Sequence, residues 1–378
     1  MKKILLAGVG FVALCIMIIT LWFAAVLRNL PDVSLLKNYR PAAAAEVLDR
    51  DGALLTHYYD KKFRIWVPIS GIPDNLIQAV VTAEDDTFFG HKGVNYQAVW
   101  DALMHDVHKH RFSRGGSTIT QQMIKNVLLT KEKTLSRKVR EYVLAQKAEK
   151  ILTKRRILEI YLNEVEWGEN LHGIEAASRY YLDKHVSELT IAESALLAGM
   201  LPNPRYYNPF KRMDKTRARQ EKVLFNMQQA KLISQDEYSA ALRSAPRLRQ
   251  DGAGRFDLAV LAPGSRPCYQ NVLEDVLSDL FSEQDLYRSG MAIHTTIDKT
   301  LQDKLAEEQR GLKPSTPEQS IVVRQNGVIR AILCSGADES AINAKLDPVG
   351  GYDIGMVQTN SIDRAAIILS TGGEGIPR

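Results

Sequence analysis

A chain of 378 residues has room for two ordinary domains, or for one domain with an anchor and an appendage. A hydrophobic content of 45% and a charged content of 25% exclude a disordered protein. Three cysteines exclude a disulfide framework, and at most Cys268 and Cys334 could pair, because Cys15 lies in an apolar run. The net charge of +5 allows an anionic partner without requiring one.

The N-terminus carries the strongest compositional signal. Lys2 and Lys3 precede Ile4 to Leu27, a run of 24 residues without a charge. Roughly 20 apolar helical residues cross a bilayer core, so this run predicts a membrane anchor. A cleaved signal peptide is the alternative, but its apolar region is usually only about 7–15 residues long. The two lysines favour a cytoplasmic N-terminus, although Arg28 on the other flank weakens the charge bias.

The pattern of apolar and turn residues divides the chain into segments. We expect a tail and anchor at 1–27, a connector with short strands at 28–70, a helical domain at 71–235, and a linker with an α+β appendage at 236–378. Two short strands flank the turn at Asp51 and Gly52. Helical spacing begins at Pro73, and Thr190 with Glu193 predicts a capping box. The predicted fold class is therefore mainly α, with a smaller α+β part.

The first cluster of polar residues runs from Glu84 to Gly93. Glu84 falls at the end of the predicted helix, where the partial negative charge of the helix C-terminus should raise the pKa of its carboxyl group. A carboxylate with a pKa closer to neutrality is better suited to take a proton from a sugar hydroxyl. The alternative is an acidic loop after a surface helix.

The second cluster runs from Arg114 to Asn126 and begins with two glycines. Glycines ahead of a helix N-terminus leave backbone N–H groups free to meet an anion, so we expect a site for a diphosphate here. Thr118, Gln122 and Lys125 fall on one face of the predicted helix. The alternative is a flexible loop and an ordinary amphipathic helix. The spacing of a P-loop is missing.

The third cluster opens a long basic helix. The segment from Lys131 to Arg156 has ten basic and three acidic residues, a local net charge of +7. Glu141 shares a stripe with Ala145 and Ala148, whose small side chains leave room for a ligand. One alternative is a solvated face on which Glu141 pairs with Arg137. Nucleic-acid binding is another, and the expected location outside the cytoplasm argues against it.

Two further segments give weaker evidence for a functional site. The segment from Lys154 to Asn163 is expected to be a largely structural helix with Ile160 and Tyr161 packed inward. Histidines 105, 108 and 110 could suggest a metal site, but no carboxylate or cysteine lies at a suitable spacing, so solvated side chains are the favoured interpretation.

In this order, the clusters resemble the signature motifs of glycosyltransferase family 51, the peptidoglycan glycosyltransferases of class A penicillin-binding proteins and of monofunctional transglycosylases. The resemblance extends from about Ala45 to Pro209. It includes Glu-Asp-x-x-Phe-x-x-His-x-Gly at 84–93, Gly-Gly-Ser-Thr-Ile-Thr-Gln-Gln at 115–122, Arg-Lys-x-x-Glu at 137–141 and Leu-Thr-x-Ala-Glu-x-Ala-Leu-Leu-Ala-Gly at 189–199.

The resemblance implies a lysozyme-like, two-lobed domain that polymerises lipid II. The reaction would form β-1,4 bonds with inversion and release undecaprenyl pyrophosphate. By the same resemblance, Glu84 would deprotonate the acceptor 4-hydroxyl and Glu141 would assist on the donor side. The substrate-binding positions that it implies are Asp85, Phe88, His91, Arg114, Ser117, Thr118, Gln122, Lys125, Asn126, Arg137 and Lys138.

The C-terminal region departs from a complete class A protein. Segments 290–298 and 327–331 resemble the linker and first strands of a penicillin-binding transpeptidase. That activity needs Ser-x-x-Lys, Ser-x-Asn and Lys-Thr-Gly. The Ser-x-x-Lys of this sequence is Ser34 to Lys37, beside the anchor, and Lys-Thr-Gly is absent. We therefore expect a truncated, non-catalytic remnant that binds no penicillin covalently.

Two other functions remain open from the sequence. A lysozyme-like hydrolase would use a similar fold to cleave glycan with water, but a neutral glycan needs no basic stretch. A silent cell-wall scaffold would not need Glu84 and Glu141. No obligatory cofactor is expected, although a divalent cation (Mg or Mn) could assist at the pyrophosphate. The expected partners are lipid II, the nascent glycan strand, the membrane and other cell-wall synthesis proteins, without nucleic acid. The expected location is the bacterial inner membrane, with a single span and the catalytic domain outside the cytoplasm.

Overall fold

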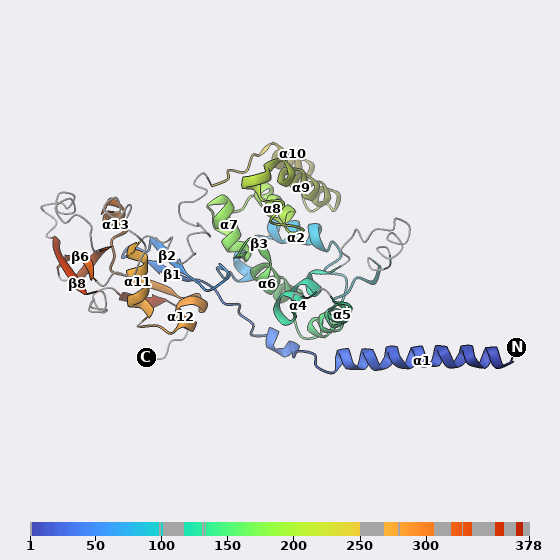
Figure 1. Ribbon diagram of the computed structural model, residues 1–378. Helices are drawn as coiled ribbons and strands as arrows, with labels where there is room; N and C mark the ends of the chain where they lie inside the picture. The colour runs from blue at the N-terminus through green and yellow to red at the C-terminus, as the bar shows by residue number, and fades with distance from the viewer. Residues whose placement is uncertain are drawn as a thin grey trace. The chain divides into compact units, whose positions relative to one another are not determined.

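The computed structural model describes residues 2–97, 100, 117–130, 132, 134–249, 268–278, 280–305, 319–326, 328–334, 352–358 and 368–372. The chain divides into two compact units. The first unit comprises residues 1–40, 67–165 and 186–246, and the second comprises residues 41–66, 166–185 and 247–378. Figure 1 traces the elements along the chain.

A single long apolar helix opens the first unit. Helix α1 (Lys2–Leu27) is followed by the short 3₁₀ helix η1 (Val33–Leu36). Within α1, Val9–Leu27 has a mean hydropathy of 2.6 and is only 6% buried. Its length and composition suffice to cross a membrane. The large apolar side chains of α1, such as Phe11 and Ile19, are exposed in the isolated chain.

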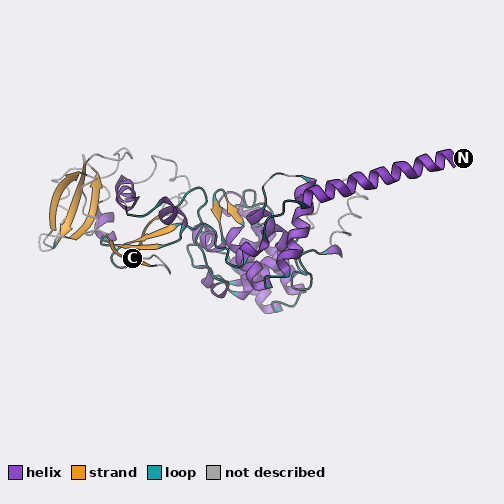
Figure 2. Cartoon of the chain, turned by 90° about the horizontal axis from the view of Figure 1, so that it is seen from below, coloured by secondary structure: helices purple, strands orange, loops and turns teal. Residues whose placement is uncertain are grey.

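The rest of the first unit is helical, as predicted (Figures 1 and 2). Its elements are η2 (Ile69–Gly71), α2 (Asp74–Glu84), α4 (Ile119–Leu128), α5 (Leu135–Glu149), α6 (Lys154–Glu164), η3 (Val186–Glu188), α8 (Ile191–Met200), α9 (Pro209–Gln229) and α10 (Gln235–Arg243). Helix α8 packs against α2 and α9, and α4 packs against α5 and α6. Every residue of α8 from Ala192 onward is buried, which explains why this helix is apolar on all sides.

Local signals fix several helix ends. The predicted capping box is present, with Thr190 and Glu193 satisfying each other's backbone N–H groups. A second box joins Thr118 to Gln121. Pro73 is the N-cap of α2, so the helix begins at Asp74, one residue later than the sequence predicted. Helix α2 ends at Glu84, as expected.

The second unit combines small sheets with short helices. Its elements are β1 (Ala45–Leu48), β2 (Leu54–Tyr58), β3 (Glu166–Gly168), β4 (Leu171–His172), α7 (Ile174–Leu182), α11 (Cys268–Ser278), α12 (Glu283–Arg288), β5 (Ala292–Thr295), α13 (Lys299–Leu305), β6 (Gln319–Gln325), β7 (Val328–Cys334), β8 (Tyr352–Gln358) and β9 (Ile368–Gly372). The sheets have the orders β2-β1-β5-β9, β3-β4 and β7-β6-β8. The described elements from α11 to β9 mix helices and strands, as predicted for the C-terminal α+β part. Strands β3 and β4 lie within 71–235, which the sequence predicted to be helical.

The predicted hairpin at the start of the second unit is present. Strands β1 and β2 are antiparallel, with Ala45 opposite Tyr58. Gly52 in the turn between them has a φ of +88°, which an L side chain rarely adopts. Strand β5 pairs parallel to β1, so the C-terminal part of the chain completes the sheet that the hairpin begins. The side chains of Cys268 and Cys334 lie outside the described part of the structure, so their pairing stays untested.

Candidate functional site

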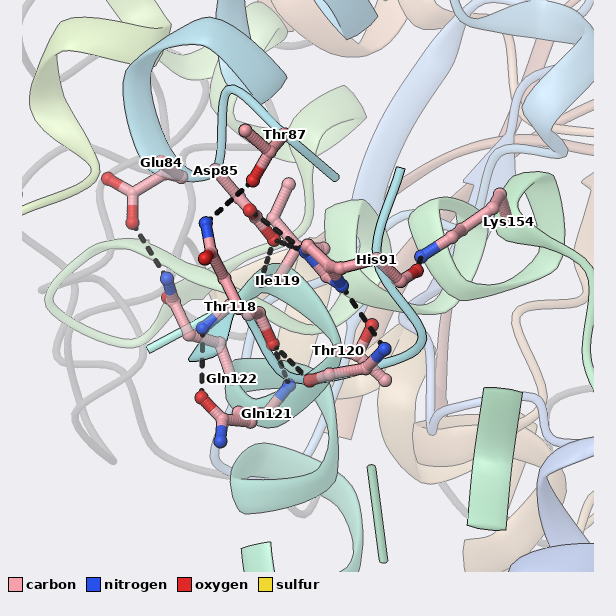
Figure 3. A network of polar contacts seen from close by, with 12 residues as sticks. Glu84, Asp85, Thr87, His91, Thr118, Ile119, Thr120, Gln121, Gln122 and Lys154 are labelled. Atoms are coloured by element: carbon pink, nitrogen blue, oxygen red, sulfur yellow. Dashed lines mark hydrogen bonds and ion pairs between the residues drawn. The ribbon is translucent and has the colours of Figure 1, made fainter. Parts of the chain in front are cut away.

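Glu84 is held by a side chain from another helix. It is the last residue of α2 and is half-buried. Gln122 of α4 donates a hydrogen bond of 2.8 Å from Nε2 to Oε2 of Glu84 (Figure 3). The hydroxyl of the fully buried Tyr161 donates to Oε1 of Gln122 over 3.4 Å. This contact orients the amide, so that its NH₂ group faces Glu84.

Burial raises the pKa of Glu84, and the nearby Asp85 raises it further. The hydrogen bond from Gln122 and the charges of Arg219 and Lys125 act in the opposite direction but do not cancel the effect of burial. The sequence predicted the direction of this shift from the helix dipole. In the structure, the loss of water around the carboxylate is the largest cause.

Asp85 ties the loop after α2 to the start of α4. Its carboxylate is buried and accepts a hydrogen bond of 3.0 Å from the backbone N–H of Ile119. Its two oxygens lie 2.9 and 3.0 Å from Nε2 of His91 (Figure 3). The N–H of Gly93 donates to Nδ1 of His91 over 3.1 Å, so Nδ1 is the acceptor and Nε2 carries the proton toward Asp85. Burial raises the pKa of Asp85.

Backbone N–H groups at the N-terminus of α4 donate to side chains of the protein. Thr118 is the N-cap, with its Oγ1 accepting from the N–H of Gln121 and donating to the carbonyl oxygen of Gly93. The N–H of Ile119 donates to Asp85. The prediction of a helix N-terminus with free N–H groups for an anion is therefore wrong at these two donors, because a cap and a buried carboxylate satisfy them. The residues before Ser117, including Arg114 and the two glycines, lie outside the described part of the chain.

A group of charges surrounds Glu141 on α5. Its carboxylate is buried and forms ion pairs with Arg137 and with Lys138, the latter at 2.9 Å. Nζ of Lys138 also donates to Oγ of Ser117 over 2.8 Å. Burial, followed by the charges of Arg137 and Lys125, lowers the pKa of Lys138 to about 8. The ion pair that the sequence offered as an alternative is thus present, although it is buried rather than solvated.

Lys125 lies within electrostatic range of both carboxylate-bearing regions. Its charge lowers the pKa of Glu84 and also lowers the pKa of Lys138. The structure therefore brings Glu84, Gln122, Lys125 and Lys138 into one neighbourhood of the first unit. Asn126, the next residue on α4, is exposed.

The small residues of α5 serve packing. Ala145 and Ala148 are fully buried, so the expected room for a ligand beside Glu141 is absent at these positions. Gly93 has a φ of +90°, and a Cβ at this position would lie 2.8 Å from the backbone of Ala145. The loop that carries His91 therefore approaches the backbone of α5 closely, which leaves no room for a side chain at Gly93.

Comparison with known proteins assigns this region to a family. Residues 51–228 match the model of the family described as Transglycosylase. This part of the chain is a transglycosylase domain. The resemblance to glycosyltransferase family 51 is thereby confirmed, and the helical first unit agrees with the predicted mainly α fold class.

Relatives of the whole region are named penicillin-binding protein 1A. The chain is 34% identical to the protein of Aquifex aeolicus over 317 residues, which are 83% of this chain and 42% of that protein. It is 33% identical to the protein of Neisseria lactamica over 313 residues, 81% of this chain and 38% of that protein. The crystal structure of penicillin-binding protein 1A from Haemophilus influenzae is similar over 71% of this chain and 29% of that chain, with 21% identity and a TM-score of 0.39. The chain thus spans about two fifths of the length of these curated relatives.

Sequence reasoning missed several residues around the site of the transglycosylase domain. Lys154 donates to the carbonyl oxygen of His91 and to Glu149, both over 2.7 Å, and its ammonium lies 4.3 Å from the ring centre of the buried Phe88. The hydroxyl of Thr120 donates to the same Glu149 over 2.6 Å. Lys154 thus connects the loop at His91 to α6, and Glu149 of α5 is bonded to both Lys154 and Thr120 of α4. Tyr161 was expected to pack inward, but its contact with Gln122 was not foreseen.

The described residues of the site offer few side chains that could bind a metal ion. Within the described ranges, no three His, Cys, Asp or Glu side chains are grouped so that they could hold a metal ion. Histidines 105, 108 and 110 lie in the stretch that is not described, so that prediction stays untested. The charges around Glu141 and Lys125 are mainly positive, which suits an anionic ligand rather than a cation.

Proposed function

We propose that the protein is a peptidoglycan glycosyltransferase that joins lipid II units into glycan strands at the bacterial inner membrane. The observation that carries the proposal is that Lys125 lies within electrostatic range both of Glu84, a carboxylate with a raised pKa, and of Lys138. An inverting glycosyl transfer to a hydroxyl needs both features. One group must accept the proton of the nucleophile, and others must meet the charge of the departing diphosphate.

Glu84 acts as the general base in this mechanism. Gln122 holds Oε2, while Oε1 accepts no hydrogen bond from the part of the chain that is described. The 4-hydroxyl of the acceptor sugar approaches Oε1 and transfers its proton to the carboxylate. The hydroxyl oxygen attacks C1 of the donor sugar from the face opposite the diphosphate, which gives the β-1,4 bond. The electron pair of the broken C1–O bond stays on the leaving undecaprenyl pyrophosphate.

The cations on α4 and α5 stabilise the leaving group. Lys125, Arg137 and Lys138 present positive charge toward the donor, and charge-assisted contacts to phosphate oxygens are among the strong hydrogen bonds in proteins. Both oxygens of Glu141 are engaged by Arg137 and Lys138. We therefore assign Glu141 the role of positioning these two cations. Ser117 holds Lys138 from the other side.

The remaining site residues maintain the shape of the loop. Asp85 and His91 connect the loop to α4, and Thr118 connects α4 back to Gly93. Phe88 fills the space beneath the loop and is fully buried. A divalent cation is not required by this scheme, because the residues at the leaving group are themselves cationic. A role for Arg114 and Asn126 at the substrate remains part of the proposal.

Helix α1 anchors the enzyme in the membrane. Its apolar span allows one crossing, and Lys2 and Lys3 favour a cytoplasmic N-terminus, which supports a catalytic domain on the outer side, where the glycan is assembled. The substrate and the product carrier are both lipid-linked, so an enzyme held at the membrane meets them directly. Other proteins of cell-wall synthesis are the expected partners.

Incubation of the full chain with labelled lipid II in detergent tests the proposal. The wild type should form polymer, whereas Glu84→Gln should lower the rate by about 10²–10⁴-fold, the usual contribution of a general base. Asp86→Asn is the matched control, because Asp86 is an exposed carboxylate two positions away. Cleavage of preformed glycan would instead indicate a hydrolase, and the absence of any reaction would indicate a scaffold. An active Glu84→Gln variant would rule out the assigned base.

A further inference from the structure

The end of the anchor helix is attached to the helix that carries Glu141. Nε of Arg140 donates a hydrogen bond of 3.1 Å to the carbonyl oxygen of Val26, in the last turn of α1. The last carbonyls of a helix have no partner within the helix and carry partial negative charge, so a guanidinium is a favourable ligand for them. Val26 is only 5% exposed, in contrast to most of α1.

The connector after the anchor is attached at a second place. Asp32 caps η1, and Leu36 at its end is fully buried. Arg156 of α6 donates to the carbonyl oxygens of Tyr39 and Leu36 over 2.6 and 3.4 Å. The hydroxyl of Tyr39 donates to the buried Glu164 over 2.5 Å. We call Arg140, Arg156 and Tyr39 the anchor clamp.

The anchor clamp acts on the same helices that carry the site. Arg140 directly precedes Glu141 on α5, and Arg156 lies on α6 together with Tyr161, which orients Gln122. A flexible connector would leave the height of the site above the membrane undefined. Its 13 residues from 28 to 40 would span roughly 20 Å on average as a random chain, a large fraction of the roughly 30 Å core of a bilayer.

We propose that the anchor clamp makes the connector a rigid mount, which holds the cations on α5 at the level of the diphosphate of a substrate embedded in the membrane. Arg140 and Arg156 are positioning residues in this scheme and contact no substrate. The inference rests on the proposed function, since it assumes a lipid-linked donor. It adds that turnover of a membrane-embedded donor depends on the fixed height, whereas turnover of a freely diffusing donor does not.

Kinetics with two substrates test the dependence on height. The full chain is placed in vesicles with lipid II, and is assayed in parallel with a short-chain, water-soluble lipid II analogue. The double variant Arg140→Ala/Arg156→Ala should lose roughly tenfold in kcat/KM on vesicle-bound lipid II, because small displacements of reacting groups are costly. On the soluble analogue it should stay within about twofold of the wild type.

The control variant removes the same charge from the same helices. Lys147 on α5 and Arg155 on α6 are exposed, so Lys147→Ala/Arg155→Ala also weakens the attraction to anionic lipids but leaves the anchor clamp intact. It should keep the wild-type rates on both substrates, and Arg140→Lys should restore most of the activity that Arg140→Ala loses. Equal losses on the two substrates would mean that the arginines only maintain the fold, and equal losses in the control would mean that charge alone matters. Either result overturns the inference.

A distance measurement tests the rigidity without any turnover. Spin labels are attached to cysteines at the exposed positions Leu21 on α1 and Lys147 on α5, after the three natural cysteines are replaced by serine. Double electron–electron resonance should give a narrow distance distribution in the wild-type background and a broad one in Arg140→Ala/Arg156→Ala. A broad distribution in the wild-type background would refute the rigid mount. If the wild type forms no polymer at all, the proposed function fails, and this measurement still decides whether the anchor clamp makes the connector rigid.

Discussion

Nε2 of Gln122 lies 2.8 Å from Oε2 of Glu84, and this bond crosses from the middle of α4 to the last residue of α2. It favours the charged form of the carboxylate and so opposes the burial that raises the pKa of Glu84. The amide cannot rotate freely, because Tyr161 donates to its oxygen. Gln122, together with the charges of Arg219 and Lys125, therefore limits how far burial raises the pKa of the proposed base.

Replacement of Gln122 by leucine should move the acid limb of the pH profile. The base works in its ionised form, so activity is lost as the pH falls through the pKa of Glu84. Loss of the bond raises that pKa further, and the acid limb of kcat/KM moves to higher pH. A hydrogen bond to a charged group contributes about 1.5–3 kcal/mol, so the shift should be about one unit or more. Tyr161→Phe keeps the amide and should shift the limb less. An unchanged acid limb in Gln122→Leu would mean that Gln122 does not affect the pKa of the catalytic base.

Thr118 offers a test of a structural role against a substrate-binding role. Its hydroxyl is buried, caps α4 and donates to the carbonyl oxygen of Gly93. Thr118→Val should lower the free energy of unfolding by about 1–2 kcal/mol, whereas Thr118→Ser keeps both contacts and should lie near the wild type. Urea unfolding gives the stability, and the KM for lipid II should change little in either variant. A large rise in KM at unchanged stability would show that Thr118 binds the substrate.

The sequence predicts correctly those parts of the structure that depend on the spacing of nearby residues. The capping box at Thr190, the turn with Gly52 and the end of α2 at Glu84 all follow from patterns within a few residues. These signals place the proposed base on the correct element and give the direction of its pKa shift. They also suffice for the mainly α fold class, because the helical segments are long and periodic.

The partners of the site residues depend instead on tertiary packing. The hydrogen bond between Asp85 and Ile119 joins residues 34 positions apart in the sequence, and the one from Lys154 to the carbonyl oxygen of His91 joins residues 63 positions apart. No local pattern predicts such pairs, since they arise from the way α2, α4 and α6 pack. For the same reason Ala145 suggested space for a ligand, although tertiary packing buries this residue completely.

Removal of divalent metal should leave most of the activity. The proposed ligands of the diphosphate are Lys125, Arg137 and Lys138, which supply the positive charge that a metal would otherwise provide. With EDTA in excess, polymerisation of lipid II should stay within about twofold of the untreated rate, a change of less than half a kcal/mol in the barrier. Added Mg²⁺ should have an equally small effect. A loss of activity in EDTA that Mg²⁺ or Mn²⁺ restores would require a metal at the leaving group.

Lys138 should define the basic limb of the pH profile. Burial and the charges of Arg137 and Lys125 lower the pKa of Lys138 to about 8, so its ammonium is charged below that pH and becomes neutral above it. As the pH rises past 8, the site loses a charge that meets the diphosphate, and kcat/KM should fall. Lys138→Arg keeps its charge at every accessible pH, because a guanidinium has a pKa above 12, and the limb near pH 8 should disappear.

Two further variants locate that limb. Lys138→Met should lower kcat/KM on the plateau and also lack the limb, since the titrating group is absent. Lys147→Arg, at an exposed position on the same helix, should keep the wild-type profile. A limb near pH 8 that persists in both Lys138→Arg and Lys138→Met belongs to another group. In that case the contacts of Lys138 with Glu141 and Ser117 have only a structural role. The positive charge that stabilises the diphosphate must then come from Lys125 and Arg137.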